Sequence, residues 1–236
     1  MNTSFQFGLK APRETARRGA AWLSVFPAWR NCTDPVALEL FDRATITALP
    51  AGANCYTEGI ECTRFAMCLS GTIRVYKTAP DGRELVLYRV QSGECCAVAT
   101  ACLLSGMPFP AATLAETEVR VATLSKAEFL DGIARSPAFR DYAVRNQARA
   151  LAVLANLVKT MAFDTVETRI ARCLLERADT DGRVGITHQM LATELGTVRE
   201  VVTRILKHFK RRNWIEIQRG TIQLRDRYGM SALVGY

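Results

Sequence analysis

Residues 187–209, THQMLATELGTVREVVTRILKHF, contain side chains whose types and spacing suit base recognition. Arginine can donate two hydrogen bonds to guanine, glutamate can accept one from cytosine, and lysine can neutralise a phosphate. On a single helix, residues three and four apart share a face, so such groups could enter the major groove together. The residues that we expect on this face are Arg199, Glu200, Thr203, Arg204 and Lys207.

Two short helices joined by a glycine would position these groups. Thr187 can cap the first helix, and Gly196 can end it in a conformation that other residues resist. Ala192 is small where the helices would cross closely, and Thr197 can cap the second helix. The expected apolar faces are Met190, Leu191 and Leu195 on the first helix and Val202, Ile205, Leu206 and Phe209 on the second. This pattern is typical of a helix-turn-helix.

A hairpin is expected after the second helix. Residues 214–217 and 221–224 are rich in isoleucine and are joined through Arg219-Gly220. The hairpin would form a wing beside the helices. We expect Arg219, His188, Thr187 and Thr197 to lie near the DNA backbone. Residues 164–236 are therefore predicted to be a winged helix-turn-helix DNA-binding domain.

The charge distribution supports a polyanionic partner. The chain has 236 residues and a formal net charge of +8. Seven basic residues stand against two acidic ones between positions 199 and 219, around the expected recognition helix. We therefore expect double-stranded DNA as the partner. Residues 1–36 hold a second basic excess and are expected to be an N-terminal basic arm, partly disordered.

The sequence gives no sign of export or membrane insertion. Arg17-Arg18 precedes an apolar run, but Pro27 and Arg30 interrupt the run and no cleavage site follows. No stretch reaches the ~18 apolar residues of a membrane span. We expect a cytoplasmic protein with no membrane partner. Its eight cysteines then need another explanation than a structural disulfide framework.

Residues 37–136 are predicted to form an antiparallel β-roll with a sensor role. Short runs rich in Val, Ile, Tyr and Thr are separated by turn residues at 49–52, 69–71, 80–82, 92–93 and 105–108. Pro80-Asp81-Gly82 is typical of a hairpin, and Ser125 with Glu128 forms a capping box for a helix. The fold class is therefore α+β.

Residues 137–163 are predicted to be a dimerisation helix and hinge. Apolar residues recur at steps of four and three, as in the seam of a two-stranded coiled coil. The predicted seam is Val144, Ala148, Leu151, Ala155 and Val158. Asp164, with Glu167 three residues later, is expected to cap the next helix, at 165–178. We therefore expect a homodimer.

This order of roll, long helix, hinge and winged helix-turn-helix resembles the CRP/FNR family of bacterial transcription regulators. The resemblance depends on FDTVETRIARCLLERA at 163–178, ITHQMLATELGTVREVVTRILKHF at 186–209, the roll and the wing. It implies a cyclic-nucleotide-binding-like roll and binding to an inverted repeat. It also implies that Arg199 and Arg204 contact guanine, that Glu200 accepts from cytosine, and that Thr203 lies near a thymine methyl or a phosphate. RNA polymerase would be a partner of an activator.

The sequence departs from the family at the positions that bind the effector. Cyclic-AMP-binding members hold the phosphate with a Gly-Glu-Leu turn and an Arg-Ser pair, where this chain has Ala97-Val98-Ala99 and Pro110-Ala111. No arginine stands between Arg89 and Arg120, so a buried phosphate would lack a cation. The N-terminal cysteine group of iron–sulfur members is absent, and both histidines fall in the helix-turn-helix. Cyclic nucleotide or haem binding is therefore a minor alternative.

Six of the eight cysteines fall in the roll, between positions 55 and 102. Cys68 and Cys173 are expected to be small buried hydrophobes. Cys95 and Cys96 are adjacent, so only one of them can face inward if the segment stays extended. Parity then places Cys96 on the same face as Cys102, and a bond between the two would require the chain to bend. Cys62 in a polar loop is a third candidate, with Arg64 and Arg89 as the nearest cations by sequence. These residues predict a redox, reactive-sulfur or metal sensor.

One other control signal remains open, and one other class of protein is not expected. A small organic ligand in the roll could control the regulator instead. Any resident cofactor stays unknown, since an iron–sulfur cluster or another metal on the cysteines is also compatible with the pattern. A cysteine-nucleophile enzyme would need a nearby base. The roll contains no histidine, so we do not expect an enzyme.

Overall fold

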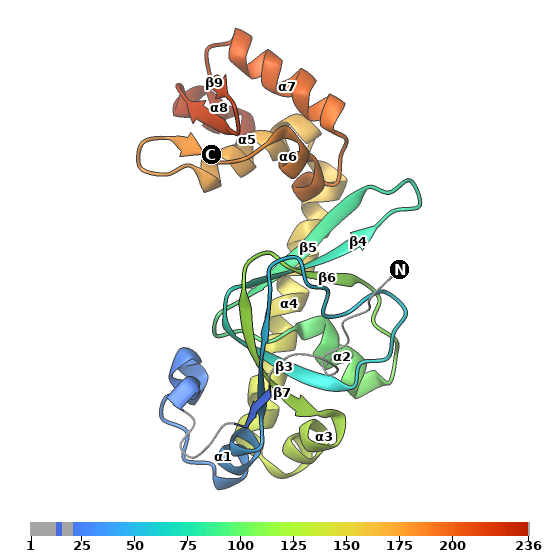
Figure 1. Cartoon of the computed structure of the whole chain (residues 1–236). Coiled ribbons are helices and arrows are strands. Elements are labelled where there is room, and N and C mark those ends of the chain that lie inside the picture. Colours follow the sequence, from blue (N-terminus) through green and yellow to red (C-terminus); the bar gives the residue numbers. More distant parts are fainter. Residues whose placement is uncertain (1–12, 16–20, 236) are drawn as a thin grey trace. The chain divides into compact units, whose positions relative to one another are not determined.

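A computed structural model of the chain describes residues 13–15 and 21–235 (Figure 1). The chain divides into two compact units. The first comprises Met1–Lys77 and Leu87–Leu154, and the second comprises Thr78–Val86 and Ala155–Tyr236. The two units are described separately below.

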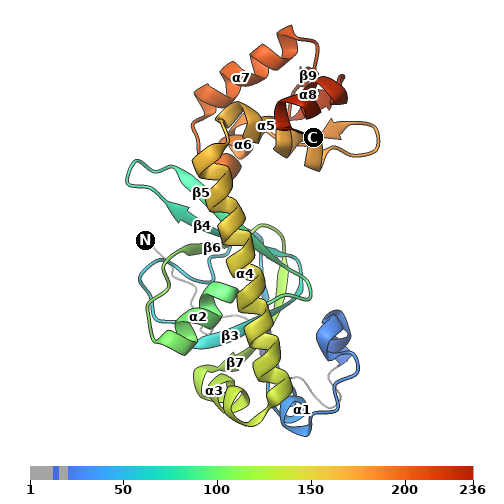
Figure 2. The same cartoon turned by 180° about the vertical axis from the view of Figure 1, so that it is seen from behind.

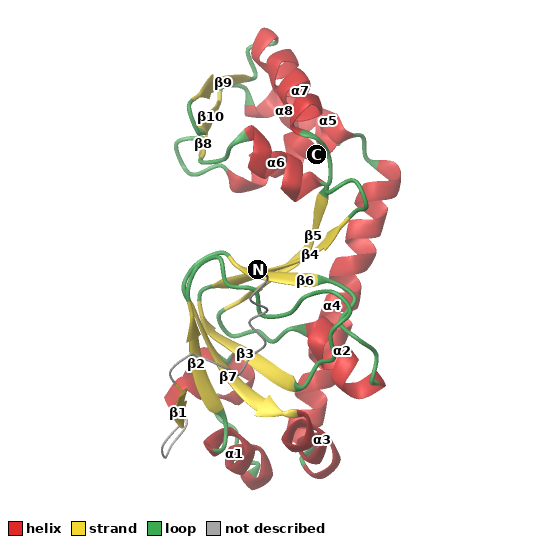
Figure 3. Ribbon diagram, turned by 45° about the vertical axis from the view of Figure 1, so that its right-hand side comes forward, coloured by secondary structure: helices red, strands yellow, loops and turns green. Residues whose placement is uncertain are grey.

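Two antiparallel sheets form the roll of the first unit (Figure 3). The first sheet has the order β1-β2-β7-β3, formed by Arg13–Thr15, Thr45–Leu49, Val119–Ser125 and Arg64–Ser70. The second has the order β5-β4-β6, formed by Glu84–Gln91, Thr72–Thr78 and Ala112–Ala115, and the residues of β4 and β5 within Thr78–Val86 are assigned to the second unit. In the register of the first sheet, Thr47 lies opposite Val121, and Met67 lies opposite Ala122. The predicted antiparallel roll is confirmed.

Tight turns join the strands where the sequence predicts them. Gly71, between β3 and β4, has a φ of +85°, and a Cβ there would lie 2.2 Å from the carbonyl oxygen of Glu118. Only glycine fits so close an approach. The amide of Ala79 donates to the carbonyl of Arg83 at 2.7 Å, which closes the predicted turn between β4 and β5.

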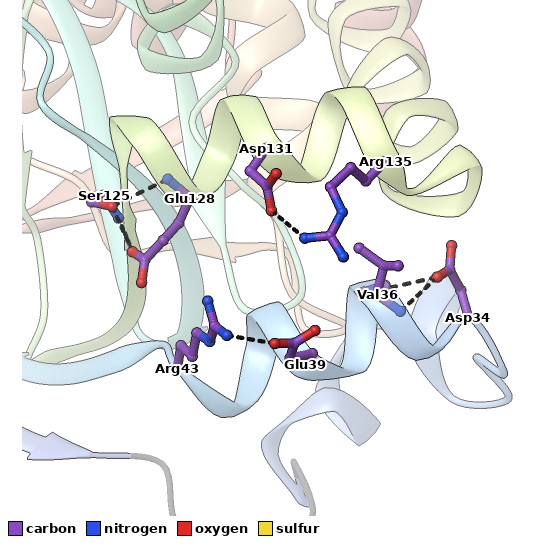
Figure 4. Close-up of polar contacts among 9 residues, drawn as sticks. Asp34, Val36, Glu39, Arg43, Ser125, Glu128, Asp131 and Arg135 are labelled. Atoms are coloured by element: carbon purple, nitrogen blue, oxygen red, sulfur yellow. Dashed lines mark hydrogen bonds and ion pairs between the residues drawn. The ribbon is translucent and has the colours of Figure 1, made fainter.

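Capped helices flank the roll (Figure 4). The predicted capping box of Ser125 and Glu128 opens α3, Lys126–Arg135. Asp34 caps α1, Pro35–Asp42, by accepting from the amide of Val36 at 3.0 Å. The Ser136 hydroxyl donates to Asp34 at 2.6 Å, and this bond fixes the end of α3 to the start of α1.

Residues 97–105 form a helix, α2 (Ala97–Ser105), so the condition of an extended chain between Cys96 and Cys102 is not met. Cys96 stands at its N-cap, and Gly106 ends it in the left-handed conformation. The Thr100 hydroxyl donates a hydrogen bond to the carbonyl of Cys96 at 2.9 Å. These end signals outweigh the β-preference of Val98 and Thr100.

The predicted basic arm, expected to be partly disordered, does not describe residues 21–34. Two 3₁₀ helices, Ala21–Val25 and Pro27–Trp29, pack on the roll and bury Leu23, Phe26 and Trp29. The Trp29 ring lies 4.8 Å from that of Phe41. This segment is ordered because its apolar and aromatic side chains are buried. The basic residues beside them favoured the prediction of an arm. Residues 1–12 and 16–20, where the rest of the predicted arm falls, lie outside the described residues.

One long helix, α4, runs from Pro137 to Phe163, which confirms the predicted helix at 137–163. Phe139 and Ala143 bury its roll-facing side, and the Gln147 amide donates to the carbonyl of Ala97 at 2.8 Å. Figure 2 shows α4 running past α2. None of the described helices combines the length and apolarity that a membrane span needs.

The second unit has four further helices and a small sheet. They are α5 (Val166–Arg177), β8 (Arg183–Val184), α6 (His188–Leu195), α7 (Arg199–Arg211), β9 (Ile215–Gln218), β10 (Thr221–Leu224) and α8 (Arg227–Val234). The order β8-β10-β9 confirms the predicted hairpin and adds a third strand. Thr165 caps α5 instead of Asp164, so that expectation is wrong. Asp164 forms an ion pair with Arg172, and the pairing lowers the pKa of its carboxyl.

Candidate functional site

The exposed face of α7 carries the side chains predicted to read DNA. Val202, Leu206 and Phe209 are fully buried in the second unit, so the opposite side of the helix faces outward. Arg199, Glu200, Arg204 and Lys207 are exposed. A hollow along this face is lined by Arg199, Glu200, Thr203, Arg204, Lys207, Lys210 and Arg211 of α7 and by Asn213, just after the helix. Lys210, Arg211 and Asn213 were not predicted as site residues. Their charge or polarity at the end of the recognition helix could have indicated them.

The helix ends explain why this face is presented. The Thr187 hydroxyl accepts from the amide of Met190 at 3.1 Å, which confirms the first predicted cap. Gly196 ends α6 at φ +61°, as predicted. The second cap is wrong, because Val198 and not Thr197 precedes α7, and it makes no side-chain cap. Met190 is 52% exposed and does not belong to the predicted apolar face.

His188 is bound to the recognition helix. Its Nδ1 lies 2.9 Å from the hydroxyl of Thr203, so one α6 side chain holds one α7 side chain in place. Burial, and then the positive charge of Arg199, lowers the pKa of His188. At neutral pH the ring is therefore uncharged. Thr203 is half-buried and bonded to His188, and it still lines the hollow along the recognition helix.

The wing lies close to the start of the recognition helix. Thr187, His188 and Arg199 line one hollow with Gln189 and Gln218. Arg219 is exposed in the turn between β9 and β10. The structure therefore brings the predicted backbone-contacting residues of α6 and α7 next to the wing. The two glutamines were missed, since their sequence carries no signal beyond polarity.

The predicted seam forms an apolar stripe on α4. Val144, Leu151 and Val158 are 61%, 69% and 67% exposed, and Ala148 and Ala155 are also exposed. Large apolar side chains at heptad spacing are rarely left in water on a single helix. The stripe has no cover within the described residues.

The roll interior near α2 is filled by its own side chains. The Tyr88 hydroxyl accepts from the amide of Val98 at 3.0 Å and lies 3.5 Å from the sulfur of Cys96. That amide would be a donor to a bound phosphate, and no arginine or lysine stands on α2. The residues present therefore do not fit a cyclic nucleotide phosphate at this position.

The predicted sensor cysteines are buried and pair differently from the expectation. Cys96 and Cys102 were expected to meet, but the sulfur of Cys96 lies 3.5 Å from the hydroxyl of Tyr88, and the thiol of Cys102 donates to the carbonyl of Pro108 at 3.6 Å. Cys62 lies near enough to Cys102 to influence its pKa, and burial, followed by the nearness of Cys95, raises the pKa of the Tyr142 hydroxyl on α4. The expectation followed from an extended strand, which α2 replaces. The described residues contain no group of three or more histidine, cysteine or acidic side chains that could hold a metal.

Burial keeps these thiols protonated. It raises the pKa of Cys55 and Cys95 to about 12 and that of Cys68 to about 11. Burial also raises the pKa of Cys62, Cys96 and Cys102. The expected thiolate-stabilising arginines are elsewhere: Arg89 bonds Glu116 at 2.8 Å, and Arg64 bonds Thr123 at 3.2 Å. A closed roll therefore holds few reactive thiolates.

Two known domain families match this chain. The cyclic nucleotide-binding domain matches residues 46–136, and the Crp-like helix-turn-helix domain matches residues 168–233. A CRP-like cAMP-activated global transcriptional regulator of Mycobacterium tuberculosis is 26% identical over 75% of this chain and 82% of its own. The cAMP-activated global transcriptional regulator CRP of Salmonella typhimurium is 27% identical over 80% of this chain and 94% of its own.

Solved structures show the same fold. A transcriptional regulator of the CRP/FNR family from Eubacterium rectale has a TM-score of 0.79 and 24% identity over 90% of this chain and all of its own. The c-di-GMP responsive global regulator CLP of Xanthomonas campestris has a TM-score of 0.72 and 19% identity, over 81% of this chain and 98% of its own. The chain belongs to the CRP/FNR family of transcription regulators.

Proposed function

We propose that the protein is a homodimeric transcription regulator that binds an inverted repeat in double-stranded DNA. The exposed, basic and hydrogen-bonding face of α7 is the observation on which the proposal depends. The side chains of Arg199, Glu200 and Arg204 would read bases, and that of Lys207 would contact a phosphate. Such a regulator acts in the cytoplasm, and RNA polymerase would be its partner where it activates.

Two copies would associate through the stripe on α4. A two-fold dimer presents two recognition helices to half-sites about one turn of DNA apart, ~34 Å. Burying the exposed Leu151 and Val158 against their symmetry mates would stabilise the dimer by roughly 1.5–3 kcal/mol for each fully buried side chain.

DNA binding should depend steeply on salt. Each phosphate neutralised lowers the slope of log K against log salt by about 0.9. For a dimer making roughly 6–10 phosphate contacts, affinity should fall ~10³–10⁵-fold between 50 and 200 mM salt. Fluorescence anisotropy of a labelled duplex measures this. A salt-independent affinity would contradict a DNA-binding role for the basic face.

For the signal, we propose a redox response centred on Cys62 and Cys102. The two thiols are buried in the same core and lie near enough to influence each other's pKa, and this proximity supports the proposal. Hydrogen peroxide would join the two sulfur atoms in a disulfide and would itself be reduced to two waters, which take up the two thiol protons. A disulfide there would fix α2 to the 57–63 loop. Because α2 is bonded to α4 through Gln147, the change would reach the dimer helix.

The thiol proposal predicts a changed gel shift after treatment with peroxide. Wild-type protein should change DNA affinity and lose two free thiols, whereas Cys102→Ser should do neither. Cys173→Ser is the matched control, because Cys173 is buried in the second unit and should leave the response intact. Reaction should be slow, since the thiols are protonated. Equal affinity of all three proteins before and after oxidation, with all thiols free, would exclude the redox signal.

A small organic ligand is the second candidate signal. Several relatives are named as cAMP-activated, but Tyr88 occupies the amide that a phosphate would use. A ligand of this chain would therefore need another site than the filled interior beside α2.

A further inference from the structure

His188 and Thr203 share a hydrogen bond beside the hollow along α7. The Nδ1 atom of His188, on α6, lies 2.9 Å from the hydroxyl oxygen of Thr203, on α7. Thr203 also lines that hollow, together with Arg199 and Arg204. The same side chain is therefore bonded within the protein and borders the surface at which the proposed function places DNA bases.

The direction of this bond determines what Thr203 can offer to a base. A threonine hydroxyl has one proton to donate and lone pairs with which it accepts. If its proton goes to the imidazole, only the lone pairs remain, and they can accept from the amino group of cytosine or adenine. If the imidazole donates instead, the hydroxyl proton is free to reach an acceptor of guanine or the O4 atom of thymine. The state of His188 therefore selects between two kinds of base partner.

The neutral imidazole accepts the threonine proton when DNA is bound. One nitrogen of a neutral ring donates and the other accepts. Nε2 of His188 has no hydrogen-bond partner within the part of the chain that the structure describes, and the residue lines the hollow beside the wing, with Gln218 and Gly220. A DNA phosphate at this hollow would accept from Nε2, and Nδ1 would then hold the lone pair that accepts from Thr203.

A second proton on the ring reverses the bond. Both nitrogens of an imidazolium donate, so Nδ1 would donate to the Thr203 oxygen and leave the hydroxyl proton free for the DNA. Burial, and then the charge of Arg199, lowers the pKa of the ring, whereas the other polar residues of the hollow, Thr187, Gln189 and Gln218, carry no charge. The phosphates of bound DNA act in the opposite direction, because a negative charge favours the imidazolium.

We propose that His188 is a positioning residue that sets the hydrogen-bond polarity of Thr203. With a neutral ring, the regulator prefers cytosine or adenine at the base that Thr203 contacts. With a protonated ring, it prefers guanine or thymine at that base. This inference rests on the proposed function, because it requires α7 to lie against the bases, and it adds one base position whose reading changes with pH.

Competition binding with operators that differ at one symmetric base position tests the polarity. Thr203→Val keeps the shape of the side chain and removes the hydroxyl, so it identifies the position as the one whose preference it relaxes. For wild-type protein, the affinity ratio between the cytosine or adenine operators and the guanine or thymine operators should fall about ten-fold from about pH 7.5 to about pH 5.5. Affinity for the guanine and thymine operators should rise over the same range, since DNA binding favours the protonated ring.

Histidine variants assign the pH dependence to one ring. His188→Asn places an amide near the position of Nδ1 but does not titrate, so its base preference should be the same at both pH values. His208→Asn is the matched control, because His208 is the other histidine of the chain, lies on α7 and faces Glu167, and this variant should keep the wild-type change.

The outcomes separate this inference from the proposed function. A pH-independent ratio in wild-type protein, no base position relaxed by Thr203→Val, or a wild-type change that persists in His188→Asn would each overturn the inference while sequence-specific binding remained. Absence of sequence-specific binding by wild-type protein at both pH values would overturn the proposed function as well.

Discussion

Replacing Arg204 by alanine is expected to cost about 1–3 kcal/mol of operator affinity, which is roughly 5- to 150-fold. The side chain is exposed on α7, and a bidentate contact to guanine would be lost with it. Glu200→Ala should have a similar effect at another base. Each variant should also relax preference at one position of each half-site. Competition binding against a set of single-base operator variants measures both effects.

Two further variants separate base reading from general charge. Lys207→Ala should weaken binding to all sequences alike and reduce the salt slope by about 1, because it removes a phosphate contact. Arg183→Ala removes an exposed arginine on β8 of the same unit and should change neither. If Arg204→Ala kept full affinity and full base preference, α7 would not be the reading helix.

Leu151→Glu is expected to convert the dimer to monomer. Leu151 is 69% exposed at the middle of the stripe, so the substitution is tolerated by the isolated fold. In a dimer the two glutamates would be buried against each other without a partner, at a cost of several kcal/mol. Sedimentation velocity should show monomer, and operator binding should fall because the half-sites would be bound separately.

Asn156→Glu is the matched control for this variant. Asn156 is exposed on the same helix but away from the heptad positions of the stripe. It adds the same charge and should leave a dimer. A stable, fully dimeric Leu151→Glu protein would show that the stripe is not the seam.

The winged unit could be predicted closely because its signals are local. Thr187 and Gly196 determine the ends of α6, and the spacing of Val202, Leu206 and Phe209 determines the inner face of α7. Thr197 misled the prediction, because a threonine beside a helix start caps it only when the chain enters at that residue. Here Val198 takes that position.

The roll was less predictable, since its outcome depends on tertiary contacts. Apolar and β-branched residues at 97–105 fit a strand or a buried helix equally well, and only the position of Gly106 favours α2. Trp29 looks like part of a basic arm, but its ring packs against those of Phe41 and Phe139 in the core, and Phe26 is fully buried there. Cys62 in a loop and Cys102 on a helix lie near each other in the same core, and sequence spacing could not reveal that proximity.

Selection of binding sites from random duplex DNA tests the central claim most directly. Wild-type protein should enrich an inverted repeat whose half-site centres are about 10 base pairs apart, and Leu151→Glu should lose that repeat. Glu200→Ala should enrich a repeat relaxed at one position of each half-site. Enrichment of no sequence, or of a motif without two-fold symmetry, would contradict a dimeric regulator that reads DNA through α7.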